Sequence, residues 1–300
     1  MRLQIVAVPS VEAAGEESTG PYAAKAGGLA RGSDAFLAAG LVEALEGGGA
    51  EVAGVGRVEL PAAEVSGDPV ADLGRLGAKI AEAVAGAVGT GARPLLAGGT
   101  CSHVPGLLAG LQRAYGPTAR LGMVWFDAHG DFNTPKTSRS GMLGGMPVAV
   151  AAGLCHPAWR EGAGMAAPLP TDRIVFVDVR DLDPREAELI GATDATVARL
   201  RPGQSGPSAE EAVAALAERV DHLYLHVDAD VLDPSLMPSS PVAAPDGPDL
   251  ERTLAAIRAA MATGKVRAYG VVAVDPTGPG GPTSLASGMA LLREGVAAWR

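Results

Sequence analysis

Residues 123–131 read MVWFDAHGD, and residues 223–234 read LYLHVDADVLDP. In both stretches a nearly continuous apolar run leads directly into aspartates. Apolar runs without alternation are typical of parallel strands whose two faces are both covered by helices. Ligands of such sheets bind at the carboxyl ends of the strands. The two stretches therefore predict a buried parallel sheet with a functional site at one edge.

The same pattern continues along the chain. Helices are expected at 208–220, where Ser208 and Glu211 have the spacing of a capping box, and at 249–263. Short β-branched runs alternate with such segments, which predicts parallel strands joined by crossover helices. Because no polar linker interrupts the pattern, we expect one α/β domain over residues 1–300. Strands are expected at 3–8, 50–55, 93–97, 122–126, 173–177, 223–227 and 268–274.

Composition excludes several classes of protein. The chain has 34 acidic and 24 basic residues and a net charge of −10. Nucleic acids and anionic membranes are bound through clustered positive charge, so neither is an expected partner. The chain has two cysteines, no visible signal peptide and no apolar run of the ~18 residues that a membrane span needs. We therefore expect a cytoplasmic protein.

Acidic residues at the two strand ends predict a metal site. Asp127, His129 and Asp131 alternate at the end of the first stretch, and Asp228 and Asp230 do so within the second. Alternate residues of an extended segment share a face, so four carboxylates and one imidazole converge if the strands are neighbours. One such motif alone is more typical of a turn or a helix N-cap. Two of them favour a pair of divalent ions, Mn(II) before Zn(II), because the negative charges need compensation.

The motifs resemble those of the arginase, or ureohydrolase, family, whose signatures are GGDHS, DAHxD and SxDxDxxDP. Here they read GGTCS at 98–102, DAHGD at 127–131 and HVDADVLDP at 226–234. The resemblance implies a three-layer α/β/α sandwich with a mostly parallel central sheet, two Mn(II) ions per subunit and a homo-oligomer. It implies that Asp127 and Asp228 bridge the ions. His129 and Asp230 would complete one ion's site.

The other ion would be held by Asp131 and Cys101. Cys101 stands where the family has a histidine, and Thr100 replaces the preceding aspartate. A thiolate is a softer ligand that makes Zn or Fe possible at this site. Free cysteine is also a common buried filler at strand ends, so ligand and filler remain open alternatives. His103 is a candidate replacement ligand or a capping group, and His226 is expected to pack beside the site.

The resemblance also implies an amino-acid-like substrate. Asn133 and Ser140 match positions that hold the substrate α-carboxylate in arginases. Asp183 matches the position that holds the α-amino group, and Glu186 lies nearby. Structural alternatives exist, because Asn133-Thr-Pro is a good turn and Asp183-Pro is a good helix start.

Two further departures concern the substrate. Gly144 occupies the place of a histidine that shuttles protons, and Ala273 occupies the place of a glutamate that pairs with the guanidinium. Asp275 follows two residues later and could face the same cleft. Members with a cysteine in the first motif are similar to hydroxyarginine amidinohydrolases. The less basic hydroxyguanidine tolerates the missing glutamate better.

We therefore expect a binuclear metal-dependent hydrolase that cleaves the C–N bond of a guanidino or hydroxyguanidino amino acid. Nω-hydroxy-L-arginine is favoured over L-arginine. A metal-bridging hydroxide would attack the central carbon, with Asp230 and His129 as the catalytic residues and Asp230 assisting proton movement. The alternatives are a catalytically weak member with a metal- or ligand-binding role and a hydrolase of another small amidine or amide.

Overall fold

The computed structural model describes residues 1–9, 27–116 and 118–300. Its strands form one eight-stranded sheet in the order β2-β1-β3-β8-β7-β4-β5-β6, and every neighbouring pair is parallel. The strands are β1 (Arg2–Ala7), β2 (Glu51–Arg57), β3 (Arg93–Ala97), β4 (Leu121–Phe126), β5 (Ile174–Val177), β6 (Thr196–Ala198), β7 (His222–Asp228) and β8 (Val266–Val272). The sheet confirms the expected α/β class.

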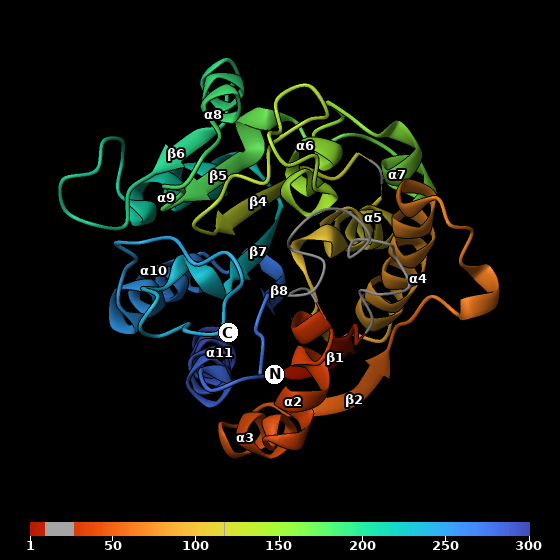
Figure 1. Ribbon diagram of the computed structural model, residues 1–300. Coiled ribbons are helices and arrows are strands. Elements are labelled where there is room, and N and C mark those ends of the chain that lie inside the picture. The colour runs from red at the N-terminus through yellow and green to blue at the C-terminus, as the bar shows by residue number, and fades with distance from the viewer. Residues whose placement is uncertain (10–26, 117) are drawn as a thin grey trace.

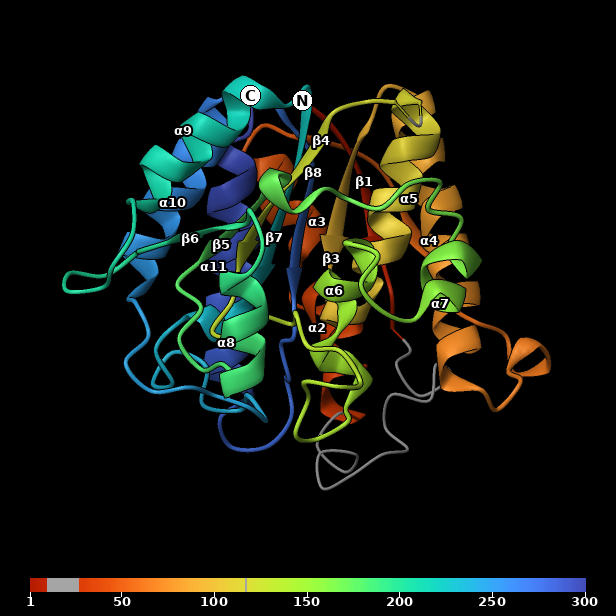
Figure 2. The same ribbon diagram turned by 90° about the horizontal axis from the view of Figure 1, so that it is seen from above.

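Helices cover both faces of this sheet, which makes three layers (Figures 1 and 2). One face carries α2 (Gly32–Ala38), α3 (Leu41–Gly47), α9 (Ala209–Arg219), α10 (Leu250–Ala262) and α11 (Gly281–Ala298). The other carries α4 (Pro69–Gly89), α5 (Val104–Tyr115), α6 (Pro147–Ala151) and α7 (Pro157–Gly162), with α8 (Pro184–Gly191) beyond β5. Single 3-10 turns are η3 (Ala62–Glu64), η4 (Cys101–His103), η5 (Leu143–Gly145), η6 (Thr171–Arg173) and η7 (Ala229–Val231).

Each face of the sheet has its own apolar core. In β4, Val124 and Phe126 belong to the core under α9 to α11, whereas Met123 and Trp125 belong to the core under α4 to α6. All six residues of this strand are buried. Because strand residues point alternately to the two faces, a strand covered on both sides must be apolar throughout. This explains the continuous apolar run that leads into Asp127.

The expected elements differ from the observed ones mainly at their ends. Helix α9 begins after its N-cap Ser208, which forms the expected capping box with Glu211. The last strand begins at Val266, where it pairs with Leu223 of β7, and ends at Val272. It cannot continue to 274 as expected, because Ala273 has a φ of 60°, outside the extended region.

One strand is absent from the sequence prediction. β6 has three residues at the edge of the sheet and pairs only with β5. With only three residues, Thr-Val-Ala, it is too short to give the apolar run by which the other strands were found.

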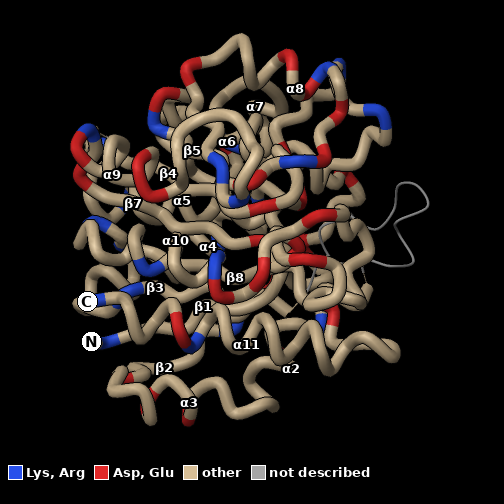
Figure 3. The backbone as a smooth tube through the Cα atoms, turned by 90° about the vertical axis from the view of Figure 1, so that its left-hand side faces the viewer, with Lys and Arg blue, Asp and Glu red and all other residues tan. Residues whose placement is uncertain are grey.

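Charged residues of both signs are interspersed over the face shown in Figure 3. In the described part of the chain, no helix is long and apolar enough to cross a membrane.

Candidate metal centre

The predicted site residues meet at the carboxyl edge of the sheet. Cys101 follows β3, Asp127 follows β4, and Asp228 ends β7, so elements more than 100 residues apart meet there. These three residues line a cavity of about 570 Å³. All six residues expected to hold metal line it: Cys101, Asp127, His129, Asp131, Asp228 and Asp230. The structure therefore brings the whole predicted ligand set together.

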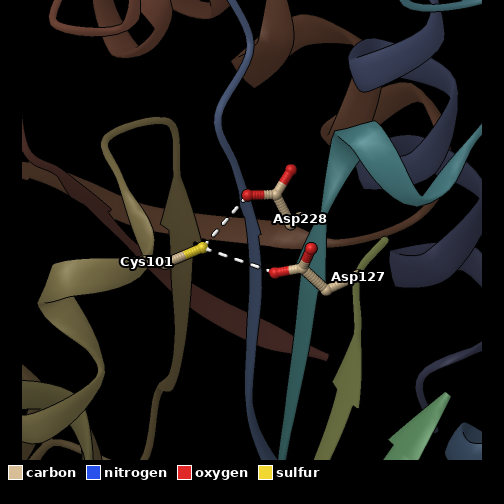
Figure 4. A group of neighbouring side chains, drawn as sticks. All are labelled: Cys101, Asp127 and Asp228. Atoms are coloured by element: carbon tan, nitrogen blue, oxygen red, sulfur yellow. Dashed lines mark hydrogen bonds between the residues drawn. The ribbon is translucent and has the colours of Figure 1, made fainter. Parts of the chain in front are cut away.

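Cys101, Asp127 and Asp228 form one compact group. Figure 4 shows the Cys101 thiol pointing toward both carboxylates, with Sγ 3.0 Å from Asp228 Oδ2 and 3.9 Å from Asp127 Oδ2. All three residues are buried, and their ligand atoms lie within 4.8 Å of one another. That separation allows a single cation to contact all three.

Asp127, His129 and Asp230 form a second compact group, in which Asp127 is shared with the first. His129 Nδ1 lies 3.2 Å from Asp127 Oδ1 and 3.3 Å from Asp230 Oδ2. The His129 backbone N–H also donates to Asp127 Oδ1 at 2.6 Å, and its carbonyl accepts from Trp125 Nε1 at 3.3 Å. These bonds fix the imidazole between the two carboxylates.

Asp131 lines the same cavity but belongs to neither compact group. Its φ is 46°, a conformation that few non-glycine residues adopt. Its carbonyl accepts hydrogen bonds from Val148 N at 3.0 Å and Ala149 N at 3.4 Å, at the start of α6. These bonds stabilise the turn that presents the Asp131 carboxylate to the cavity.

A buried arginine holds the loop that carries Asp230. Arg180 pairs with the fully buried Asp178, at 2.8 Å from Nη1 to Oδ2. The same guanidinium donates to the carbonyl oxygens of Val231 at 3.0 Å and of Asp230 at 3.2 Å. The sequence analysis did not identify this pair. A short Asp-Val-Arg segment after a strand carries no distinctive signal, although Asp178 after β5 follows the same strand-end rule as Asp127.

The electrostatics of the centre indicate missing positive charge. Burial and neighbouring carboxylates raise the pKa of Asp127, Asp131 and Asp228 above the ordinary range of aspartate. Burial lowers the pKa of His129, but the adjacent carboxylates of Asp230 and Asp127 outweigh burial and raise it overall. Asp230 Oδ2 is buried and accepts no hydrogen bond from the described residues. A divalent cation would satisfy this oxygen and offset the repulsion, so the donor set fits a metal centre.

Three of the residues expected to bind the substrate line the rim beside one another. Asp183 Oδ2 accepts from Asn133 Nδ2 at 3.4 Å and from the Arg139 backbone N–H at 3.2 Å. Ser140 is exposed at the cavity, where its hydroxyl accepts from Met142 N at 3.2 Å. Asn133 and Asp183 are therefore coupled to each other as well as directed toward the cavity.

Glu186 joins the loop that follows β4 to the start of α8. Its position in the sequence only partly indicates this role. Oε1 accepts from the backbone N–H of Phe132 at 2.8 Å, and Oε2 accepts from that of Asp183 at 3.2 Å. A Cβ on Gly130 would lie 2.8 Å from Oε1, which explains why glycine stands in the DAHGD motif. Glu186 lines the cavity, but both of its oxygens are engaged in holding these two loops together.

The two residues that depart from the family pattern near the expected substrate, Gly144 and Ala273, leave space in the cavity. Gly144 and Ala273 both line it, and a Cβ on Gly144 would come no closer than 3.8 Å to any neighbour. Asp275 is not among the lining residues of the described chain. Its Oδ1 accepts from Thr277 N at 2.7 Å and from Thr277 Oγ1 at 2.5 Å. The expectation that Asp275 could face the same cleft finds no support, because its carboxylate caps the following turn.

Arg139 was not singled out from the sequence. Among the described residues that line the cavity it is the only lysine or arginine. Its Nε lies 3.6 Å from Asp183 Oδ1. Its position in the sequence was the available signal, because a basic residue there lies between Asn133 and Ser140, the two residues expected to bind a carboxylate. Its side chain is 72% exposed, so it can reorient toward a ligand.

His103 is a buried capping residue. Its Nδ1 accepts the backbone N–H of Thr100 at 3.3 Å, which closes the η4 turn around Cys101. Burial lowers its pKa to about 3. Of the two roles considered for it, the capping role is the one the structure supports.

A parallel α/β/α sandwich with an Asp- and His-rich centre at the carboxyl edge of its sheet is the architecture of the ureohydrolase class, which the sequence motifs resemble. A family model described as the arginase family matches residues 25–295. The chain belongs to the arginase family.

Curated relatives support this assignment over part of the chain. The arginase of Bacillus caldovelox is 39% identical over 164 residues, which cover 53% of this chain and 54% of that protein. An N(omega)-hydroxy-L-arginine amidinohydrolase of Streptomyces lavendulae is 35% identical over 153 residues, which cover 51% of this chain and 50% of that protein. The chain thus spans about half the length of the curated relatives it matches.

Solved structures match over nearly the full length. The Bacillus caldovelox arginase structure has a TM-score of 0.77 at 29% identity and covers 96% of both chains. A Bacillus subtilis arginase structure has a TM-score of 0.81 at 23% identity, covering 99% of this chain and 98% of that one, and is similar in fold. These matches confirm the expected three-layer fold.

Proposed function

We propose that this protein is a binuclear metal-dependent hydrolase of a guanidino or hydroxyguanidino amino acid. The observation that carries the proposal is the pair of compact ligand groups that share Asp127 within one cavity. The product pair would be an amine and urea, or hydroxyurea when the substrate is N-hydroxylated. One sheet that takes strands from residue 2 to residue 272 also supports the proposal of a single domain.

The proposed ligands are divided between two ions. Cys101 and Asp131 would hold one ion, His129 and Asp230 the other, and Asp127 and Asp228 would contact both. When bound, two Mn(II) ions would neutralise the carboxylates and make a water molecule acidic enough to serve as the nucleophile near neutral pH. A mixed centre with Zn or Fe beside Cys101 fits the softer thiolate donor.

Asp230 and His129 are the proposed catalytic residues. Asp230 Oδ2 lies 3.3 Å from His129 Nδ1 and otherwise lacks a hydrogen-bond partner among the described residues. The Asp230–His129 pair would accept a proton from the attacking water and release it toward the leaving amine. The His129 side chain is 23% exposed, and its Nε2 lies 3.9 Å from Asp181 Oδ2, which connects this pair to the solvent side of the cavity.

The rim of the cavity is proposed to bind the amino-acid end. Asn133, Ser140 and the guanidinium of Arg139 supply donors for a carboxylate, and Asp183 supplies an acceptor for an α-amino group. Arg139 is the only lysine or arginine among the described lining residues. This charge supports a substrate with a carboxylate at the end remote from the reacting carbon.

A hydroxyguanidine is the preferred reacting group in this proposal. Ala273 provides no carboxylate to pair with a guanidinium, and Gly144 provides no group to protonate the leaving amine. A hydroxyguanidine is less basic than a guanidine. It therefore depends less on a carboxylate at the position of Ala273. An N(omega)-hydroxy-L-arginine amidinohydrolase, that of Streptomyces lavendulae, is among the relatives the chain is similar to, alongside arginases.

The test compares L-arginine with Nω-hydroxy-L-arginine at equal concentration in the manganese-loaded protein. Ornithine release is measured, because both substrates yield it, and Asp230→Asn provides the background. Faster release from the hydroxylated substrate supports the proposal. Faster release from L-arginine overturns the preference, and release from neither substrate above the variant's background overturns the hydrolase assignment.

A further inference from the structure

A histidine near the end of β7, His226, contacts the Cys101 sulfur. His226 is fully buried, and its ring stacks on Trp125 with centroids 4.0 Å apart and planes 3° apart. Its Nε2 lies 3.4 Å from Cys101 Sγ, and its Nδ1 lies 2.7 Å from the hydroxyl of Tyr224. The ring is thus held by stacking and by one polar contact at each nitrogen.

The direction of these hydrogen bonds follows from the number of donors. The Tyr224 hydroxyl is fully buried, and its contact with His226 is its only hydrogen bond among the described residues. If Nδ1 donated to it, the phenol proton would be buried without an acceptor, at a cost comparable to a lost hydrogen bond. With Tyr224 donating to Nδ1, a neutral imidazole carries its proton on Nε2. That N–H then donates to Cys101 Sγ.

We propose that Tyr224 and His226 are positioning residues that make the Cys101 sulfur a metal ligand. The inference rests on the metal centre proposed above. Sulfur surrounded by the carboxylates of Asp127 and Asp228 is a poor place for negative charge, because the charges repel one another. An N–H donor aimed at the sulfur offsets part of that repulsion without adding a competing ligand or a net charge.

The arrangement also explains why Cys101 can stand where the family has histidine. A histidine ligand is fixed by a partner at its second nitrogen. A cysteine has no second donor atom, so its orientation must be fixed by a bond to the sulfur itself. His226 supplies that bond from β7, and Tyr224, two residues earlier on the same face of the strand, fixes the tautomer of His226.

The test uses Co(II) as the probe, because cobalt bound to a thiolate gives a sulfur-to-metal charge-transfer band in the near ultraviolet. The unmodified protein is expected to show this band, and Cys101→Ser is expected to lose it. His226→Leu is expected to weaken Co(II) binding by about 10- to 100-fold, the usual range for groups that orient a ligand. His226→Gln keeps an N–H donor and is expected to recover much of this loss.

Tyr224→Phe is the conservative variant. It removes one oxygen from a buried ring and is expected to shift the band and weaken Co(II) binding about tenfold. Tyr269→Phe is the matched control, because Tyr269 is equally buried but donates to the Leu291 carbonyl at 2.9 Å, away from the cavity. It is expected to leave the band and the affinity unchanged.

Two results would overturn the inference. One is a charge-transfer band absent from the unmodified protein, which removes Cys101 from the ligand set. The other is a Tyr224→Phe or His226→Leu variant whose band and affinity match those of Tyr269→Phe. If His226→Leu does not fold, Tyr224→Phe alone decides the outcome. A failure of the proposed hydrolysis is distinguishable, because it leaves these spectra and affinities as expected.

Discussion

Replacing Asp228 by asparagine should raise stability without metal and reduce the stabilisation that manganese provides. Asp228 Oδ1 accepts from Asp230 N at 2.9 Å, and Oδ2 lies 3.0 Å from the Cys101 sulfur. An asparagine that keeps Oδ1 in place directs its Nδ2 donor toward this sulfur, which can accept. Asp228→Asn therefore removes one buried ionisable group and keeps the shape of the site, but it reverses the hydrogen bond that the Cys101 thiol donates to Asp228 Oδ2.

The magnitude follows from the buried charges. Without metal, burial and the neighbouring carboxylates raise the pKa of Asp228, so folding either ionises this carboxyl against repulsion or must protonate it. Asparagine avoids that cost, and the expected gain is about 1–3 kcal/mol. At a hundredfold excess of Mn(II) over its Kd, the unmodified protein gains about 2.7 kcal/mol. Loss of a ligand that we propose both ions share should reduce the manganese-induced gain below about 1 kcal/mol. For a chain of this size, 1 kcal/mol corresponds to about 2 °C in Tm.

The assay is thermal unfolding at constant pH and salt, in EDTA and in Mn(II). We expect a higher Tm for Asp228→Asn in EDTA and a smaller manganese-induced rise. Asp221→Asn is the control, because Asp221 is an exposed partner of Arg120. Its manganese-induced rise should equal that of the unmodified protein. A lower Tm of Asp228→Asn in EDTA, or an unchanged manganese-induced rise, would refute the reasoning.

Three other predictions can be checked with the same protein. Gly144→His, whose Cβ meets nothing closer than Met142 at 3.8 Å, should raise kcat for L-arginine with little change in Tm. Arg139→Ala should raise KM about fivefold for substrates with a carboxylate, the value of an exposed charge pair worth about 1 kcal/mol, and leave KM for decarboxylated analogues unchanged. In the metal-free protein the pKa values of Asp127 and His129 are raised, so the native state binds more protons than the unfolded chain. Its unfolding free energy, measured in urea, should therefore fall as the pH rises, through Asp127 from about 4 to about 7 and through His129 from about 6.5 upward, and Mn(II) should abolish this fall.

The sequence predicts the centre of the sheet better than its periphery. Strands β4 and β7 are buried on both faces, so their apolar runs are unmistakable and the aspartates that follow them mark the site. β6 lies at the edge of the sheet with an exposed middle residue, and its three residues carry no such pattern. β2, at the opposite edge, has no buried residue, but its seven residues are enough to give a strand pattern, whereas the three residues of β6 are not.

The sequence also predicts the centre of the site better than its surroundings. The six proposed ligands lie in two strand-end motifs and one turn, so strand order alone brings them together. Arg139, Arg180 and the Tyr224–His226 pair could not be assigned, because their roles depend on which loops face each other across the cavity. Residue spacing within one strand does not contain that information. Homo-oligomer formation stays a prediction, which analytical ultracentrifugation can test.

The order of the strands has a consequence for folding. Cys101, Asp127 and Asp228 follow β3, β4 and β7, and β8, the last strand in the chain, lies between β3 and β7. Asp127, His129 and Asp230 follow β4 and β7, which pair directly, so this group can form without β8. Cys101 can join Asp127 and Asp228 only after residues 266–272 have inserted between β3 and β7. Local opening of β8 should accordingly separate Cys101 from Asp228 and weaken metal binding at that group first.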